Sequence, residues 1–321
     1  APNTQPQKFL DDLADKGKGK AYTAENATQL SAAFSKILQD VLRKDSTFVS
    51  PGATVNQFNR QSNKNEVYFA LFKPSETNSW VGNLKRYGLN AGTGDLIVDA
   101  NNDGAIDLTT GFFKSDAQSF WSATKDGNDT AKGGAANRLP THTSRKAYTY
   151  LGTSPVTPAN LTSSASLLNT DNAAITQAKL GAADADERIA LINWIRGLND
   201  DGSARNAVGD PLHSVPRLVT YKCNSFTDTA LTQCASEEQS VFVGTNEGFV
   251  HAFNTNTGDE QMAFMPESLL SNIKTLKANE NTPQTGRQYG MDNTVAIWVN
   301  DLNRNGVIYG GRDTSKTEPE L

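Results

Sequence analysis

The last third of the chain consists of short apolar runs separated by Gly and Asn turns, and this alternation restricts the region to β structure. Four such runs follow one another at 215–221, 240–244, 249–254 and 261–265. Runs of this length, rich in Val, Phe and Thr and bounded by turn residues, are typical of strands. Thr257 and Gly258 fit a tight turn between the last two runs. The sequence therefore predicts an antiparallel sheet within residues 209–321.

The run 241–260 has the layout of one blade of a β-propeller. It ends in Ala252-Phe-Asn254-Thr-Asn-Thr257-Gly258, which resembles the Ala-x-Asp-x-x-Thr-Gly repeat of quinoprotein-type propellers, with Asn254 at the Asp position. One blade cannot close a propeller, which takes about four to eight. We therefore expect an incomplete propeller with an open strand edge. Such an edge would pair with another chain or with further blades.

The preceding part of the chain combines strand signals with helical ones. Apolar residues recur at helical spacing over 30–41. The segment 184–197 begins with acidic residues, has Ile189, Ile192 and Ile195 recurring on one side, and ends at Gly197. Both patterns predict helices. Strand signals occupy 54–58, 66–72, 84–89 and 95–98, and the polar stretch 152–180 predicts a surface excursion.

Residues 1–45 resemble the C-terminal end of a von Willebrand factor A domain. In that domain a glycine-rich turn, a Tyr-containing strand and a closing helix complete the sheet, and the metal-dependent adhesion motif belongs to an earlier part. We therefore expect a mainly β chain with a few helices, in three parts. These are the end of a von Willebrand factor A-like domain at 1–45, a β-rich region with a helix near 184–197 at 46–208, and the start of an incomplete quinoprotein-like propeller at 209–321.

The segment from Asp99 to Asp107 has the spacing of a calcium-binding loop. Calcium takes six to eight oxygen ligands, and alternate residues of a tight loop can supply them. Gly104 suits the positive φ of a sharp turn, Ile106 would anchor the loop in the core, and Thr110 replaces the usual bidentate Glu. The expected ligands are Asp99, Asn101, Asp103, the carbonyl of Ala105, and Asp107. The alternative is a surface turn rich in Asn, Asp and Gly that binds no ion.

A second segment repeats this pattern with less charge. It has oxygen-bearing side chains at the first, third and fifth positions and Gly306 at the sixth, but Tyr309 replaces the acid at the ninth. With one carboxylate it should bind calcium weakly unless another acid joins it. The expected ligands are Asp301, Asn303, Asn305, the carbonyl of Val307, Tyr309 and Asp313. An empty turn is the alternative.

Charge and cysteine content narrow the class of protein. The formal net charge of −5 argues against a nucleic-acid-binding face, which would be basic. No apolar run reaches the length that a bilayer needs, so we expect no membrane insertion. The two cysteines, Cys223 and Cys234, flank a short polar segment, so a local disulfide worth roughly 3 kcal/mol is expected. Together with the calcium pattern, this favours an oxidising, extracellular compartment over a cytosolic protein with two free thiols.

Several motifs in order resemble the PilY/PilC family of type IV pilus tip adhesins and assembly factors. The most specific is Gly209-Asp-Pro-Leu-His213-Ser-Val-Pro216. The others are Trp80-Val-Gly-Asn-Leu-Lys-Arg-Tyr87, Gly111-Phe-Phe, Ser119-Phe-Trp121-Ser122, Gly133-Gly-Ala-Ala136, Trp194-Ile-Arg-Gly197 and Tyr289-Gly290-Met-Asp292. Their order and spacing cover nearly the whole chain.

The resemblance implies an extracellular protein, exported through the periplasm, at the cell surface or pilus tip. Family members support pilus assembly and adhesion and work with pilus tip (minor pilin) proteins, while the host or surface receptor is set by the N-terminal part. In the family, a calcium-loaded propeller loop is linked to pilus extension and retraction. By position, that loop corresponds to Asp301–Tyr309 here.

Catalytic groupings are not evident, so we expect a non-enzymatic protein. His142, His213 and His251 lack zinc-ligand spacing, and we expect His213 to be a buried, hydrogen-bonded residue. The four tryptophans are expected in the core. One alternative is a quinone-dependent periplasmic dehydrogenase, which would need a complete propeller and a catalytic Asp. Another is a structural fragment of a surface filament whose blade edges pair with neighbours.

Overall fold

A computed structural model of the chain describes residues 5–17, 21–24, 26–30, 33, 48–53, 65–90, 96–152, 163–226, 234–280 and 286–298. The chain forms two compact units, residues 1–46 and residues 47–321. The first unit contains helix α1, Gln5–Lys16, on which Phe9, Leu10 and Leu13 are exposed. The helix expected over 30–41 is described only in part, and residues 27–30 and 33 are helical.

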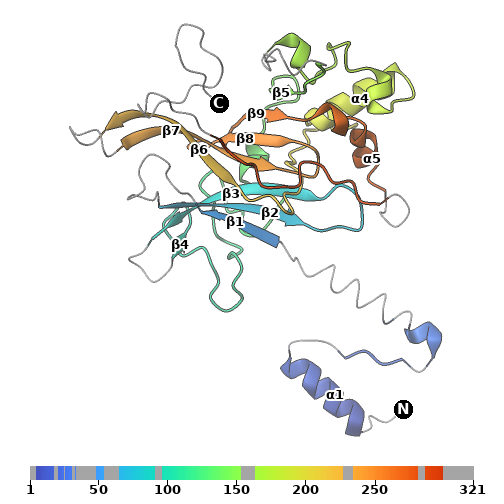
Figure 1. Ribbon diagram of the computed structural model, residues 1–321. Coiled ribbons are helices and arrows are strands. Elements are labelled where there is room, and N and C mark those ends of the chain that lie inside the picture. The colour runs from blue at the N-terminus through green and yellow to red at the C-terminus, as the bar shows by residue number, and fades with distance from the viewer. Residues whose placement is uncertain are drawn as a thin grey trace. The chain divides into compact units, whose positions relative to one another are not determined.

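The second unit begins with a four-stranded antiparallel sheet (Figure 1). Its strands are β1, Phe48–Ala53; β2, Glu66–Lys73; β3, Val81–Leu89; and β4, Ile97–Val98. They follow one another across the sheet in chain order. Residues 67–72 of β2 are all buried because other residues cover both faces of this strand. That burial explains why β2 is apolar at nearly every position instead of alternating.

A five-stranded sheet in the order β5-β9-β8-β7-β6 forms the second layer. Its antiparallel strands are β6, Arg217–Phe226; β7, Cys234–Gly244; β8, Val250–Asn254; and β9, Glu260–Phe264. The strands expected near 215–221, 240–244, 249–254 and 261–265 are therefore confirmed, whereas the propeller stays a prediction. Strand β5, Ala147–Tyr148, adds to its edge in parallel with β9. No local pattern in the sequence predicted this two-residue strand.

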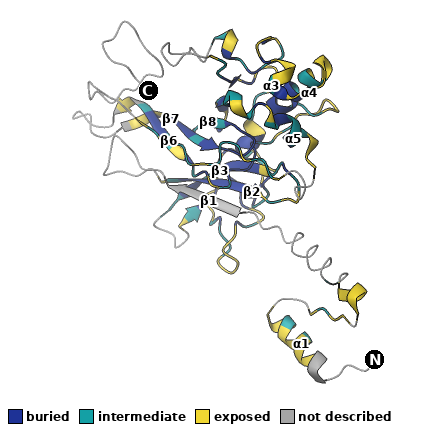
Figure 2. Cartoon of the chain, turned by 45° about the vertical axis from the view of Figure 1, so that its right-hand side comes forward, coloured by how far each residue is buried: buried dark blue, intermediate teal, exposed yellow. Residues whose placement is uncertain are grey.

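The two sheets share one hydrophobic cluster. Tyr68 and Leu84 from the first sheet pack with Val241 and Phe253 from the second, and Trp121 completes the cluster. These strands appear as dark blue ribbons in the middle of Figure 2. Each sheet buries apolar side chains on both faces, since further residues cover its other side. The second unit is therefore a stack of two antiparallel meanders.

Helices cover the outer face of the second sheet (Figures 1 and 2). They are α3, Gln177–Leu180; α4, Ala185–Arg196; and α5, Asn272–Ala278, with single-turn 3-10 helices at η2, Ser164–Ser166, and η3, Glu267–Leu269. A further 3-10 helix, η1, Ala135–Arg138, packs instead in the cluster between the two sheets. The α4 prediction is confirmed: the Asp184 side chain accepts from the Glu187 N–H at 2.8 Å, and Gly197 ends the helix at φ 110°. Ile192 and Ile195 are buried, whereas Ile189, expected on the same side, is 42% exposed. An α-helix has 3.6 residues per turn, so residues spaced three apart lie progressively further around its axis. Ile189, Ile192 and Ile195 therefore do not share one narrow face.

Candidate functional site

Asp99 anchors the first calcium-like loop. Its carboxylate is 4% exposed and accepts three backbone hydrogen bonds. Oδ1 accepts from the N–H of Asn101 at 2.8 Å and of Asp103 at 3.1 Å, while Oδ2 accepts from Gln118 at 3.0 Å. Asp99 therefore shapes the turn that carries Asn101 and Asp103, whose side chains are exposed.

The backbone of this loop differs from the expected one. The positive φ lies at Asn102, at 65°, and not at Gly104, whose φ is not positive. Gly104 instead pairs with Val98 in an isolated antiparallel bridge, which requires extended backbone. Apart from Gly, Asn tolerates the left-handed region best, because its short side-chain amide can form hydrogen bonds with the nearby backbone. The prediction for Gly104 was therefore wrong by two positions.

The second half of the loop turns toward other partners. Ala105 is fully buried, and its carbonyl accepts from the Lys114 N–H at 2.9 Å. Asp107 caps the next turn, accepting at Oδ1 from Thr109 and Thr110 at 2.8 and 3.4 Å. The bond from the Thr109 backbone N–H lowers the pKa of Asp107. Among the described residues, no group of three or more His, Cys, Asp or Glu side chains is close enough to hold a metal ion.

Two further predicted sites fall partly or wholly outside the described residues. The loop of Asp301, Asn303, Asn305, Val307, Tyr309 and Asp313 lies outside them entirely. The backbones of Cys223 and Cys234 lie on the adjacent strands β6 and β7, opposite Glu237 and Phe226 respectively. Their side chains are outside the described part, so the disulfide remains a prediction.

Three of the family-like motifs meet in a buried polar cluster between the sheet and the loop 119–134. Lys85 of β3 and Asp126 are both buried, with 3.0 Å between Nζ and Oδ2. Lys85 also donates to the carbonyls of Asp126, Gly127 and Asp129 at 2.9–3.0 Å. Burial lowers the pKa of Lys85, and the Asp126 carboxylate opposes this shift. Ser119 and Ser122 donate to the same carboxylate at 2.8 Å.

Asn83 ties the Gly133-Gly134 turn to this cluster. Its amide donates to the carbonyls of Thr130 and Gly133 at 3.0 Å and accepts from the Ala136 N–H at 3.0 Å. A Cβ at Gly134 would lie 2.7 Å from the Asn83 Oδ1 atom, and φ there is +57°. Glycine is therefore required at this turn both for space and for conformation.

The Gly209–Pro216 and Tyr289–Asp292 motifs form a second cluster at the surface. The Asp210 Oδ1 atom accepts from Asn246 Nδ2 and Arg287 Nη2, both at 2.7 Å. Asn246 also donates to Asp292, whose other oxygen lies 2.6 Å from the His213 Nδ1 atom. Burial raises the pKa of Asp210, although the Asn246 amide and Arg287 act against it. This cluster brings together chain positions more than 80 residues apart.

His213 is hydrogen-bonded, as expected, but it is not buried, since its side chain is 62% exposed. The tryptophans also divide. Trp121 and Trp194 are buried, while Trp298 is 69% exposed. Trp80 is half-buried beneath the guanidinium of Arg287, which lies 3.2 Å from the ring centroid. An arginine above an indole is a favourable cation–π arrangement, so Trp80 belongs to the surface cluster and not to the core.

A third polar group lies inside the second sheet. Arg145 binds Glu260 through two hydrogen bonds of 2.7 and 2.8 Å, and both side chains are almost fully buried. His251 lies between Glu260, at 2.7 Å, and the carbonyl of Val208, at 3.1 Å. Burial alone would raise the pKa of Glu260, but Arg145 and His251 outweigh it and lower the pKa to about 2. His251 is thus a packed core residue.

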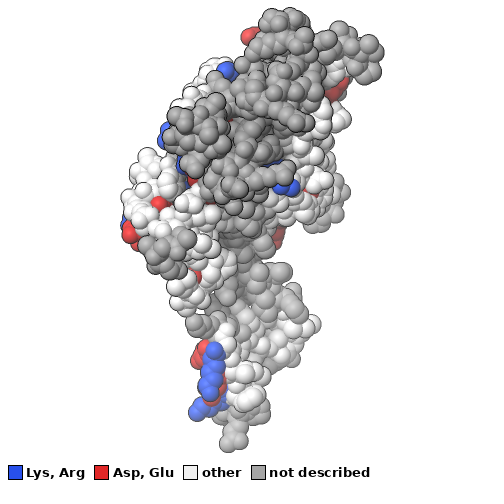
Figure 3. Space-filling model, turned by 60° about the vertical axis from the view of Figure 1, so that its left-hand side comes forward, with Lys and Arg blue, Asp and Glu red and all other residues white. Residues whose placement is uncertain are grey.

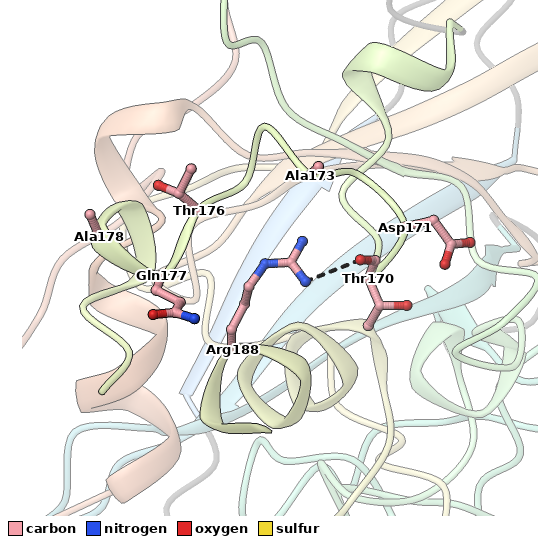
Figure 4. Close-up of a pocket in the computed structure, with 7 residues that line it drawn as sticks. All are labelled: Thr170, Asp171, Ala173, Thr176, Gln177, Ala178 and Arg188. Atoms are coloured by element: carbon pink, nitrogen blue, oxygen red, sulfur yellow. Dashed lines mark hydrogen bonds between the residues drawn. The ribbon is translucent and has the colours of Figure 1, made fainter. Parts of the chain in front are cut away.

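A hollow of about 540 Å³ lies between α4 and the loop 170–178 (Figure 4). Arg188 points into it and donates to the carbonyls of Thr170, Asn172 and Ile175 at 2.6–3.1 Å. The guanidinium therefore holds the loop closed against the helix and has little capacity for a ligand. On the face in Figure 3, a group of basic and acidic residues stands together at the lower end, and the other described charged residues are scattered among uncharged ones.

Comparison with known proteins finds relatives of this chain among curated pilus proteins. The chain is 27% identical over 278 residues to "Type IV pilus biogenesis factor PilY1" of Pseudomonas aeruginosa strain UCBPP-PA14, a match that covers 81% of the chain and 21% of that protein. It is 32% identical over 157 residues to a PilY1 homolog of Xylella fastidiosa, covering 42% of the chain and 12% of the relative. The chain is thus similar to proteins named as type IV pilus biogenesis factors.

The relatives from both species are named as PilY1 or as its homolog. A second P. aeruginosa PilY1, from strain PAK, matches 81% of the chain at 24% identity. The chain is thus related to the PilY1-type pilus factors, as its motifs predicted. It spans about a fifth of the length of the P. aeruginosa relatives. No protein-family model matches the chain, and no solved structure does so either.

Five of the motifs that carried the resemblance contribute residues to the two clusters, but the chemistry of these clusters was not anticipated. Sequence reasoning missed the Lys85–Asp126 pair and the Asp210–Asn246–Arg287 contacts. A signal existed: Lys85 lies at the centre of the nine-residue strand Val81–Leu89, and a lysine buried in such a strand needs a partner. Among the described residues, no helix is long and apolar enough to cross a bilayer.

Proposed function

We propose that the chain is a non-enzymatic module of a type IV pilus-associated protein that supports pilus assembly and surface adhesion. The observation that carries this proposal is the match to PilY1, which runs over 81% of the chain. The order of the motifs supports it as well, because motifs far apart in sequence meet in two clusters. The module would act outside the cell, at the surface or the pilus tip, together with minor pilins.

A domain exchange in P. aeruginosa tests this role. In a strain that lacks PilY1, the gene would be restored with its matching region replaced by this chain. We expect surface pili and twitching motility to return, with unmodified PilY1 and an empty vector as the two references. A chimera that is secreted intact but restores neither pili nor motility would contradict the proposal.

We further propose that the Asp99–Asp107 loop binds calcium. Two observations support this proposal. The candidate ligands all offer oxygen atoms, and Asp99 already shapes the turn. These ligands are Asp99, Asn101, Asp103, Ala105 and Asp107. Asp107 would have to exchange its bonds to Thr109 and Thr110 for the ion. Binding would stabilise the native state by mass action once free calcium exceeds the dissociation constant. The loop of Asp301 to Asp313 would form a weaker second site.

Calorimetry on chelator-stripped protein tests both loops. One or two binding events at millimolar calcium or below are expected, and Asp103→Ala and Asp301→Ala should each remove one. Asp116→Ala is the matched control, because Asp116 is an exposed acid outside both loops whose partner is Lys125. If no heat change appears at millimolar calcium, or if Asp103→Ala titrates like the parent, the first loop is a simple turn.

A further inference from the structure

The Asp210–Pro211 peptide bond has unusual chemistry. Of the 12 prolines in the chain, only Pro211 follows an aspartate. An aspartyl carboxylate can reach its own main-chain carbonyl carbon and close a five-membered anhydride. The prolyl nitrogen is a tertiary amide that leaves as a basic secondary amine. For these two reasons, Asp–Pro is the most acid-labile of ordinary peptide bonds.

The carboxylate of Asp210 is held with one oxygen engaged and the other available. Its side chain is 2% exposed. Asn246 Nδ2 and Arg287 Nη2 both donate to Oδ1, at 2.7 Å, while Oδ2 makes no hydrogen bond to the described residues. The cationic Arg287 favours the ionised, nucleophilic form of the carboxylate, and burial opposes it and raises the pKa of Asp210.

The carbonyl that would be attacked is already polarised. The main-chain oxygen of Asp210 accepts from the Asn246 N–H at 2.9 Å. A donor at this place stabilises the negative charge that develops on the oxygen in a tetrahedral intermediate. Asn246 thus contacts the peptide twice, through its backbone at the carbonyl and through its side chain at the nucleophile.

The backbone around the bond has little room to move. Gly209 has φ +83°, and a Cβ there would lie 2.7 Å from the side chain of Glu247. On the other side, a Cβ at Gly82 of β3 would lie 1.7 Å from the Gly209 carbonyl oxygen. The peptide is therefore packed directly against the first sheet. A fixed backbone keeps the nucleophile and the carbonyl in one arrangement, which lowers the entropic part of the barrier.

We propose that the folded chain cleaves its own Asp210–Pro211 bond. The Asp210 Oδ2 atom attacks the Asp210 main-chain carbon and forms a C–O bond. The C–N bond to Pro211 then breaks, and its electron pair goes to the proline nitrogen, which takes a proton from solvent. Water opens the resulting anhydride and regenerates the Asp210 side chain with a free α-carboxylate. The net reaction consumes one water molecule and needs no oxidant or cofactor.

The two products would stay together in the native state. Strand β5, in the first product, pairs with β9 in the second. Tyr68 and Leu84 pack with Val241 and Phe253 across the same division. Cleavage would therefore leave the fold intact, and the two fragments would separate only when the chain is denatured.

The test follows the purified chain with time in mildly acidic buffer, about pH 5, where acid is available to protonate the departing nitrogen while an ordinary carboxylate stays ionised. Denaturing electrophoresis and intact mass should show fragments 1–210 and 211–321, the second beginning at Pro211. Cleavage should be at least roughly tenfold faster in folded protein than in urea, because a single oxyanion donor contributes about 10²–10³ in rate elsewhere. Added hydroxylamine should be captured at Asp210, which reports the anhydride.

Matched variants separate the chemistry from folding. Asp210→Glu keeps the charge but needs a larger ring, and Pro211→Ala replaces the tertiary amide, so both should stay intact. Asp116→Glu, at an exposed acid that pairs with Lys125 outside this cluster, precedes no proline and should cleave like the parent. Tryptophan fluorescence confirms that each variant is folded. A folded parent that stays intact, an equal rate in urea, or cleavage at another bond would overturn the proposal.

Discussion

Replacing Glu260 by Gln removes the negative charge that faces Arg145 inside the second sheet. The two side chains are 0% and 2% exposed, so water cannot compensate for the loss. Gln keeps the shape of Glu, but its amide presents a donor where the guanidinium also presents donors. The variant therefore leaves a buried cation without its partner.

Two independent arguments give the size of the effect. Breaking a buried ion pair by removing one partner typically costs about 3–5 kcal/mol. The pKa of Glu260 falls from an ordinary 4.5 to about 2, a difference worth roughly 3 kcal/mol at about 1.4 kcal/mol per pKa unit. We therefore expect Glu260→Gln to lower the free energy of unfolding by about 3–5 kcal/mol at neutral pH.

The same pair predicts a pH dependence. Because the folded pKa lies below the unfolded one, the stabilisation is complete above about pH 4.5 and is lost as the pH falls from there toward 2. This loss should be absent from the variant, which has no carboxyl group at 260. The stability difference between the two proteins should therefore shrink in acid.

Urea unfolding followed by tryptophan fluorescence measures both effects, since Trp121 and Trp194 are buried in this unit. Asp200→Asn is the control: its pair with Lys277 has the Asp200 side chain 72% exposed and should contribute at most about 1 kcal/mol. The reasoning is refuted if Glu260→Gln matches this control at neutral pH. It is refuted equally if both proteins lose the same stability between about pH 5 and pH 3.

Three further substitutions probe other contacts. Gly133→Ala should lower the free energy of unfolding in urea by several kcal/mol, because its Cβ would lie 2.1 Å from the Ser122 hydroxyl oxygen. Gly202→Ala is the control: Gly202 also has a positive φ but has nothing within 4 Å, so the change should cost only about 1–2 kcal/mol. Lys85→Met should cost about 3–5 kcal/mol by leaving Asp126 buried without its partner, and additional Asp126→Asn should recover part of this loss. Cys223→Ser should lower stability by roughly 3 kcal/mol under oxidising conditions and by far less under reducing ones; equal losses in both would exclude a disulfide.

Local signals in the sequence were sufficient to predict several of the helices and strands. Helix α4 was predictable because Asp184 and Gly197 mark its two ends, and the strands from 240 to 265 were predictable because their turns separate short apolar runs. The position of the positive φ in the calcium-like loop was not predictable, since it depends on how a neighbour packs. Ile189 was misplaced for another reason: residues three apart drift around a helix. The β-rich class was therefore accessible from sequence, and the stacking of the two sheets was not.

The candidate sites were likewise predictable where they depend on local sequence and not where they depend on packing. The segment Asp99–Asp107 does form a turn around Asp99, as its spacing predicted. The sequence could not show that the Asp107 carboxylate turns to Thr109 and Thr110, because that choice depends on a hydrogen bond to the following turn. Nor could it show that Asp210 and Asn246 touch, since only the packing of strands and loops from three parts of the chain brings them together.

The pairing of β5 with β9 has a consequence for how the protein folds. Each meander joins strands that are near neighbours in sequence, so both can form early. The β5–β9 pair joins Ala147 to Ala263 and closes a loop of more than a hundred residues. Because the entropy of closing long loops must be met before their contacts form, such pairings slow folding. During synthesis the first meander would emerge well before its partner, with the apolar face of Tyr68 and Leu84 waiting uncovered. In this chain, the interval before the second sheet docks is thus the one most open to aggregation.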